Sequence, residues 1–249
     1  MTDIELARQI ADTAGRLLMD LRHSALFEGQ ALGKVGDQLA NEFIVRALRT
    51  HRPDDAILSE EGRDSAARLS ARRVWIVDPL DGTREYSEAR ADWAVHVALA
   101  IDGEAELGAV ALPGLPLVLS SGDVLNRPRH DGRLRMVVSR TRPAVEAVAV
   151  AECLNAELIP MGSAGAKAMA VVRGEADIYL HSGGQYEWDS CAPIAVAKAA
   201  GLHVSRLDGS PLRYNQADTY LPDLLVCPKE HAVRVLELVE RALARACAS

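Results

Sequence analysis

The stretch Val74–Glu85, VWIVDPLDGTRE, places a core strand directly before a group of oxygen-bearing residues. Val74 to Val77 form a continuous apolar run, which predicts a buried strand that ends at Asp78. Pro79 fixes φ and removes an N–H group, so the chain must turn there before it reaches the second acid, Asp81. We therefore expect this strand and its turn to lie in the core, with the rest of the chain arranged around them.

The turn itself offers ligands for a cation and for an anion. The carboxylates of Asp78 and Asp81, with the carbonyl of Leu80 between them, can surround one hard cation, because oxygen ligands suit Mg²⁺ and Mn²⁺. Gly82 and Thr83 offer unhindered backbone N–H groups to a phosphate, most favourably if they open a helix. Asp, Pro and Gly are also ordinary turn residues, so the local pattern is equally typical of a turn whose acids lie in solvent.

Length and composition are those of a globular protein. The 249 residues can form one large or two small domains with a sizeable core. The apolar fraction of 49% and the charged fraction of 25% exclude disordered and fibrous proteins. The formal net charge of −7 argues against a protein that holds nucleic acid through a broad basic surface, although a local metal site can still attract a small phosphorylated ligand.

Neither a membrane span nor a disulfide framework is expected. The chain has no apolar run of about eighteen residues, and its N-terminus, MTDIELARQI, lacks a basic-then-apolar signal pattern, so we expect a cytoplasmic protein. Cys153, Cys191, Cys227 and Cys247 are far apart and form no CxxC, so they are expected to be reduced, mostly buried thiols.

The chain before the opening stretch predicts two helices and one strand. Apolar residues recur at helical spacing over 4–21, and a loop or short hairpin is expected over 23–36. A second helix follows from Asp37, which is well placed as its N-cap. Ala56 to Leu58 is a short strand that runs into Ser59-Glu60-Glu61-Gly62, so a second strand also ends in acids, which favours a shared metal site.

Beyond the opening stretch the pattern changes once. Strands at 93–101, 104–112 and 115–121 predict an antiparallel meander, and the polar segment 122–132 is expected to contain a boundary between domains 1–127 and 128–249. Strands and helices then alternate, which predicts an α/β layer. The expected strands are 134–138, 157–161, 177–180, 202–205 and 223–227, and the expected helices are 143–153, 164–173, 189–200 and 229–246.

A third acid, Asp189, ends the stretch GGQYEWD at the head of one of these helices. Taken alone it is favourable as a cap or as a partner of the helix dipole, and needs no ligand. However, it belongs to a set of three features: Glu60 after one strand, DPLDGT after the next, and WD before a helix that ends in AAG. Together these features resemble the inositol monophosphatase and fructose bisphosphatase superfamily. Its members are lithium-sensitive, magnesium-dependent phosphomonoesterases. The resemblance runs from Asp37 to about Asn215, in the same order and spacing.

Within that superfamily the chain most resembles the bacterial 3′(2′),5′-bisphosphate nucleotidases of the CysQ type, which act on 3′-phosphoadenosine 5′-phosphate (PAP). The resemblance rests on short motifs in both halves of the chain. These are Arg84-Glu85-Tyr86, Val138-Ser139-Arg140, Gly162-Ser163 with Lys167, Glu187-Trp188-Asp189 and the segment Gly209 to Tyr214.

The resemblance implies a metal-binding role for each acid. Glu60, Asp78 and the Leu80 carbonyl would hold one Mg²⁺, and Asp78, Asp81 and Asp189 would hold a second, with Asp78 bridging the two. Glu60 would also reach a third, looser ion through water. Mn²⁺ would substitute for Mg²⁺, and Li⁺ would inhibit by replacing the more weakly held ion.

The resemblance also implies the catalytic and substrate contacts. Thr83, oriented by Asp37, would position a metal-bound water and help to deprotonate it. Lys167 or Arg140 would supply a positive charge for the non-scissile phosphate, but a solvated Lys167 and a Ser163 that only caps its helix are equally open alternatives. The residues expected to face the substrate are Glu60, Asp81, Gly82, Thr83, Arg140, Ser163, Lys167 and Asp189.

The chemistry supports such a site independently of the resemblance. A phosphate monoester dianion repels a nucleophile, and two cations about 4 Å apart can neutralise it, generate hydroxide and stabilise the leaving alkoxide. Such a site needs carboxylates and no Cys or His nucleophile. The seven histidines lie in no metal-like spacing and are expected to be surface or packing residues.

We therefore expect a mixed α+β fold with stacked α-β-α-β-α layers, in which helices cover an antiparallel sheet in the N-terminal part and an α/β layer forms the C-terminal part. The expected activity is Mg²⁺-dependent removal of the 3′-phosphate of PAP, and of its sulfated relative PAPS, in sulfate assimilation, by a homodimer. Hydrolysis of inositol-1-phosphate or fructose-1,6-bisphosphate by the same mechanism is the first alternative. A non-catalytic nucleotide- or metal-sensing binding protein is the second.

Overall fold

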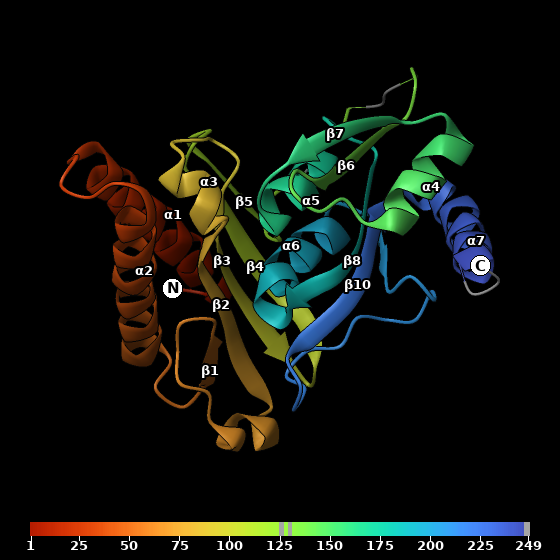
Figure 1. Ribbon diagram of the computed structural model, residues 1–249. Coiled ribbons are helices and arrows are strands. Elements are labelled where there is room, and N and C mark those ends of the chain that lie inside the picture. Colours follow the sequence, from red (N-terminus) through yellow and green to blue (C-terminus); the bar gives the residue numbers. More distant parts are fainter. Residues whose placement is uncertain (125–126, 129–130, 247–249) are drawn as a thin grey trace.

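Five layers of alternating helices and sheets make up the protein (Figure 1). The computed structural model describes residues 1–124, 127–128 and 131–246. Helix pairs form the two outer layers and the middle layer, and two five-stranded sheets lie between them. The mixed α+β class and the α-β-α-β-α order predicted from the sequence are confirmed.

The first helical layer consists of α1 (Asp3–His23) and α2 (Gly29–His51). α2 begins well before Asp37, so the loop predicted over 23–36 is wrong, and Asp37 lies inside the helix instead of capping it. The physical reason is close packing. An added Cβ at Gly33 would lie 2.7 Å from Thr83 Cγ2, so glycine at this position lets α2 approach the segment after the second strand, and tertiary contact outweighs the low helix propensity of glycine.

The first sheet has the strand order β1-β2-β3-β4-β5. The predicted meander of β3, β4 and β5 is confirmed, but β1 runs parallel to β2, so this sheet is mixed and not wholly antiparallel. Because Ser59 lies opposite Val77 in that parallel pair, the acids that follow both strands arrive at the same edge. The strands are β1 (Ala56–Ser59), β2 (Arg73–Asp81), β3 (Ala94–Ile101), β4 (Glu104–Leu112) and β5 (Leu117–Ser120), with η1 (Ala66–Ser70) before β2 and α3 (Thr83–Ser87) after it.

The second sheet has the order β7-β6-β8-β10-β9. Helices α5 and α6 lie between the two sheets, and α4 and α7 cover the outer face (Figure 1). The strands are β6 (Arg135–Ser139), β7 (Glu157–Met161), β8 (Ile178–Tyr186), β9 (His203–Ser205) and β10 (Tyr220–Cys227). The helices are α4 (Val145–Leu154), α5 (Ala164–Val172), α6 (Glu187–Ala199) and α7 (Lys229–Ala246).

Strand β2 is buried on both faces, which explains its unbroken apolar run. Trp75 and Val77 face the core shared with α1 and α2, whereas Val74 and Ile76 face the core that contains α5 and α6. This second core includes residues from both sheets, so the two predicted domains share apolar packing. Their predicted boundary at 127/128 stays a prediction, and 125–126 and 129–130 next to it lie outside the described residues.

In the described part of the chain no helix is long and apolar enough to cross a membrane. Cys191 and Cys227 are buried free thiols and Cys153 is an exposed one. Cys247 lies outside the described residues.

Candidate active site

The end of β2 carries the central acid of the site. The prediction that the strand ends at Asp78 and the chain turns at Pro79 is wrong, because β2 runs through Pro79 to Asp81. A shift in the pairing with β3 between Asp78 and Asp81 accommodates the proline instead. Asp78 is 1% exposed, and its Oδ1 accepts the N–H of Leu80 at 3.0 Å. This local bond fixes the carboxylate at the irregular end of the strand.

Three acids from two elements, β2 and α6, converge at this point. Asp78, Asp81 and Asp189 each offer a carboxylate oxygen, and these oxygens all lie within 4.8 Å of one another. Asp189 comes from the first turn of α6, where its Oδ2 also accepts the N–H of Tyr186 at 2.7 Å, so it is both a helix cap and a member of the cluster. Clustered carboxylate oxygens are the donors that hard divalent cations prefer, and the residues present therefore fit a metal site.

Glu60 joins the three acids through Asp78. The residue as a whole is exposed, but its carboxyl group is close enough to Asp78 and Asp81 for their protonation to be linked. Burial of that carboxyl group, together with the charges of Asp37 and Asp81, raises the pKa of Glu60 to about 7. Among the described residues, Glu60 is not one of the group with oxygens within 4.8 Å, which contains Asp78, Asp81 and Asp189.

The acids of the cluster repel one another, and this repulsion raises the pKa values of Asp78 and Asp189. Burial and the charges of Glu60, Asp81 and Asp189 raise the pKa of Asp78 well above its ordinary value. Burial and the charge of Asp81 raise the pKa of Asp189 to about 7. A cation bound among these groups would relieve the repulsion and favour their ionised forms.

Asp81 differs from its neighbours because it is surrounded by donors. Burial raises its pKa, but the neighbouring imidazole of His96 and the hydrogen bonds from Ser163 and from the N–H of Gly165 outweigh burial and lower it to about 2. The N–H groups of Ala164 and Gly165, 3.1 and 2.6 Å away, belong to the first turn of α5. Asp81 is thus ionised and held in one orientation at a helix N-terminus.

His96 was not recognised from the sequence as part of the site. It is completely buried, with Nε2 3.2 Å from Asp81 Oδ2 and Nδ1 3.0 Å from the carbonyl oxygen of Trp188. An added Cβ at Gly165 would lie 2.0 Å from Nε2, so the ring fits only against glycine. The expectation of a surface or packing role does not hold for His96, and the signal was a lone polar residue in the buried strand AVHVALAI.

The predicted partnership of Thr83 and Asp37 exists in the structure. Thr83 Oγ1 lies 3.3 and 3.5 Å from the two carboxylate oxygens of Asp37 and 3.1 Å from the Leu80 carbonyl oxygen. Burial and the charge of Glu61 raise the pKa of Asp37 to about 7. Both residues open onto a cavity of about 980 Å³ whose other polar lining residues are Gln30, Lys34, Gln38, Glu61, Arg84, Ser87 and Glu88.

Gly82 and Thr83 open helix α3, as the sequence analysis required for phosphate binding. Gly82 is the N-cap residue, and its φ of 90° lies in the left-handed region that favours glycine. An added Cβ would also lie 3.2 Å from Ser163 Cβ. Glycine is therefore needed for the turn that follows the acids.

The expectations for Lys167 and Ser163 need correction. Lys167 is 4% exposed, and its Nζ donates to the carbonyl oxygens of Gly162 and Ser163 at 3.1 and 2.7 Å. The alternative of a solvated Lys167 is therefore wrong, because its ammonium group is bonded to the start of its own helix; its predicted contact with the substrate stays a prediction. Ser163 does cap α5, accepting the N–H of Ala166 at 2.9 Å, and its hydroxyl also donates to Asp81.

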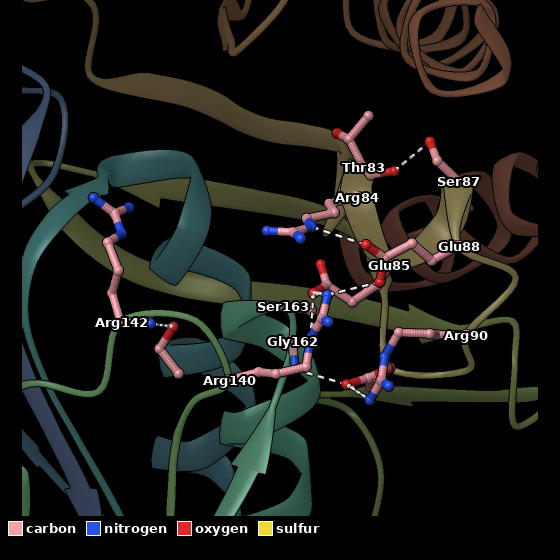
Figure 2. A network of polar contacts seen from close by, with 12 residues as sticks. Thr83, Arg84, Glu85, Ser87, Glu88, Arg90, Arg140, Arg142, Gly162 and Ser163 are labelled. Carbon is pink, nitrogen blue, oxygen red and sulfur yellow. Dashed lines mark hydrogen bonds and ion pairs between the residues drawn. The ribbon is translucent and has the colours of Figure 1, made fainter. Parts of the chain in front are cut away.

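Arg140 is likewise engaged by protein groups. Its Nη2 lies 2.7 Å from Glu85 Oε1 and 2.9 Å from Glu88 Oε2, and its Nε lies 3.2 Å from Glu85 Oε1 (Figure 2). Glu85 is only 7% exposed, so the pair is largely withdrawn from solvent. Two motifs that pointed to the nucleotidase subtype, REY and VSR, therefore meet in one ion-pair network, in which two carboxylates offset the charge of Arg140.

The fold and the acid cluster are those of a known class of enzymes. A model of the inositol monophosphatase family matches residues 2–244, and the chain belongs to this family of metal-dependent phosphatases. It is 49% identical over 254 residues to a 3′-phosphoadenosine 5′-phosphate phosphatase of Mycobacterium leprae, covering 96% of this chain and 94% of that relative.

More distant relatives agree with this assignment. The chain is 30% identical to the 3′(2′),5′-bisphosphate nucleotidase CysQ of Escherichia coli strain K12, over 74% of this chain and 80% of the relative. The crystal structure of CysQ from Bacteroides thetaiotaomicron superimposes with a TM-score of 0.82 at 26% identity, covering 91% of this chain and 97% of that one.

Proposed function

We propose that this protein is a Mg²⁺-dependent phosphatase that removes the 3′-phosphate of PAP to give AMP, and acts on PAPS in the same way. The observation that carries the proposal is the convergence of Asp78, Asp81 and Asp189 within 4.8 Å of one another, beside the hydrogen-bonded pair of Thr83 and Asp37. The 49% identity to a protein named for hydrolysis of PAP supports the substrate.

The acids would hold two Mg²⁺ ions, with Glu60 and the Leu80 carbonyl completing the set expected from the sequence. When bound, such a pair of ions lowers the charge of the phosphate and makes a water nucleophilic near neutral pH. Asp81 contributes a carboxylate that His96 and the start of α5 keep ionised and oriented. Preorganisation of this kind removes the need to reorient a ligand during the reaction.

Thr83 and Asp37 handle the proton of the attacking water. The Thr83 hydroxyl donates to the Asp37 carboxylate, so its oxygen can accept a proton from a water beside it. Asp37, with a pKa of about 7, lies close to the pH at which a general base is most effective. The N–H groups of Gly82 and Thr83 would bind the phosphate oxygens at the start of α3.

Phosphate release from PAP, PAPS, inositol-1-phosphate and fructose-1,6-bisphosphate, each with and without Mg²⁺, tests the proposal. We expect the highest kcat/KM on PAP. A preference for inositol phosphate would overturn the substrate assignment while keeping the chemistry. Absence of Mg²⁺-dependent release from all four would instead favour a sensing protein without catalysis.

The remaining expectations are part of the same proposal and rest on the resemblance. They are a homodimer, a cytoplasmic location, a role in sulfate assimilation, substitution of Mg²⁺ by Mn²⁺ and inhibition by Li⁺. Light scattering on the purified protein tests the dimer, and activity with each cation tests the metal preference.

A further inference from the structure

Arg142 is an exposed arginine close in sequence to Arg140 but with different surroundings. It lies two positions after Arg140, on the loop that leaves β6. Its backbone N–H donates to Ser139 Oγ at 3.2 Å, which fixes the loop. In the described part of the chain, however, no residue forms an ion pair or a hydrogen bond with its guanidinium group. Figure 2 shows the two side chains diverging, since Arg140 turns toward Glu85 and Arg142 extends away from it.

The guanidinium group of Arg142 lies over a stretch of bare backbone. An added Cβ at Gly184 would lie 3.4 Å from its Nη2, whereas one at Gly183 would meet nothing within 4 Å. The two glycines have φ values of 77° and 72°, a conformation that other residues rarely adopt. They form an irregularity in the pairing of β8 with β10, between Leu221 and Asp223. The backbone beneath Arg142 is thus kept free of side chains.

This bare backbone leads directly to the acid cluster. Strand β8 continues from Gly184 to Tyr186, whose N–H donates to Asp189 Oδ2 at 2.7 Å. Two residues of extended chain span about 7 Å. Two residues of extended chain therefore link the backbone under Arg142 to a residue that is bonded to Asp189, a member of the candidate metal site.

The pocket around Arg142 can hold an anion. Its volume is about 400 Å³, and its charged and titratable lining groups are Arg142, Glu146 and His181. Glu146 accepts the hydroxyl of Ser182 at 2.6 Å and is not paired with Arg142. His181 is buried with Nε2 2.8 Å from the Gly183 carbonyl oxygen. Burial and the charges of Lys167 and Arg142 lower its pKa to about 4, so it is neutral in use and leaves Arg142 as the cation of the pocket.

We propose that Arg142 binds the non-scissile anionic group of the substrate, the 5′-phosphate of PAP, and so selects bisphosphorylated nucleotides over monophosphates. A guanidinium group presents a planar fork of donors that matches two phosphate oxygens. Arg140 and Lys167 are less suited to this role, since protein oxygens already accept hydrogen bonds from both. The inference rests on the proposed function and names the residue that determines its specificity.

The test compares two substrates that differ only in the second phosphate, PAP and 3′-AMP. We expect Arg142→Met to lower kcat/KM on PAP by about 10- to 100-fold, the loss typical of a hydrogen bond to a charged group, and to leave kcat/KM on 3′-AMP unchanged. Arg142→Lys should restore part of the loss, because the charge returns without the fork. Arg213→Met is the matched control, since Arg213 is an exposed arginine paired with Glu104.

Each outcome bears on a distinct claim. An equal loss on both substrates would mean that Arg142 acts through the fold, and no loss on either would mean that it does not meet the substrate; both results overturn the inference. Wild-type protein that hydrolyses the other phosphates but not PAP would overturn the proposed substrate, and the role of Arg142 with it.

Discussion

Replacing Asp78 with asparagine should abolish hydrolysis and, at the same time, stabilise the metal-free protein. Asp78 is 1% exposed, and its Oδ1 accepts the N–H of Leu80. Asparagine has nearly the same shape and keeps an oxygen for that bond. The substitution therefore removes a charge from the acid cluster without removing that local bond.

The size of the effect follows from the spacing of the acids. The ligand oxygens of Asp78, Asp81 and Asp189 lie within 4.8 Å of one another, and two unit charges about 5 Å apart repel by about 3 kcal/mol at an effective dielectric constant near 20. A bound proton already neutralises part of this repulsion, because burial and Glu60 raise the pKa of Asp78. We therefore expect the free energy of unfolding to rise by about 1–3 kcal/mol, or about 5 °C in Tm.

The raised pKa values also predict how the stability of the metal-free protein changes with pH. Raised pKa values mean that the folded apoprotein binds more protons than the unfolded chain between the ordinary and the raised pKa. The stability of the wild type should therefore fall as the pH rises through that window, which ends near 7 for Glu60 and Asp189. The advantage of Asp78→Asn should be largest at about pH 8 and shrink toward about pH 5.

Thermal unfolding of both proteins at the two pH values, in EDTA and in Mg²⁺, measures the effect. Mg²⁺ should raise the Tm of the wild type and raise that of Asp78→Asn much less. Asp54→Asn, at an exposed acid away from the cluster, is the control and should change neither quantity. A lower Tm for Asp78→Asn at both pH values, or an equal response to Mg²⁺, would refute the reasoning.

Three further predictions concern the ion-pair network, the proton path and the second metal. Arg140→Met leaves the buried carboxylate of Glu85 without its partner, so kcat/KM should fall by the same factor on PAP and 3′-AMP. The effects of Arg140→Met and Glu85→Gln should be non-additive in a double-mutant cycle. Unequal losses on the two substrates would contradict a positioning role for Arg140. Because Asp37 must be ionised to accept a proton, kcat/KM should rise as the pH rises through about 7. Asp37→Asn should remove this rise from the pH profile and lower kcat. An unchanged pH profile would exclude Asp37 as the partner of Thr83. Millimolar Li⁺ should inhibit at sub-saturating Mg²⁺, and indifference to Li⁺ with intact Mg²⁺ dependence would mean that the second metal site is not built from Asp81 and Asp189.

Local patterns and the family resemblance predicted the layers of the fold and four acids for the site, of which Asp78, Asp81 and Asp189 lie together in the structure. Most of Val74–Glu85 could be interpreted correctly because its signals are local: an apolar run that is buried on both faces and a glycine with φ of 90° that opens a helix. The turn predicted at Pro79 was wrong, since the pairing with β3 resumes at Asp81 and the strand continues. The positions of Glu60 and Asp189, one after a strand and one at a helix start, are equally local. Their convergence followed from strand order and from the family resemblance.

Tertiary structure decided the features that depend on contacts between residues far apart in the sequence. The glycines before Asp37 are typical of a loop, yet close contact between Gly33 and Thr83 makes that segment helical. A histidine in an apolar strand becomes the partner of Asp81 only because α5 and α6 pack across it.

The same reason separates the two arginines of the loop after β6. Arg140 and Arg142 are chemically identical in the sequence, but Glu85, 55 residues from Arg140, pairs with Arg140 alone. Sequence patterns report periodicity and turn chemistry, which are properties of neighbouring residues. Whether a charged group is already neutralised depends on distant residues that packing brings into contact, and the order of residues along the chain does not show this.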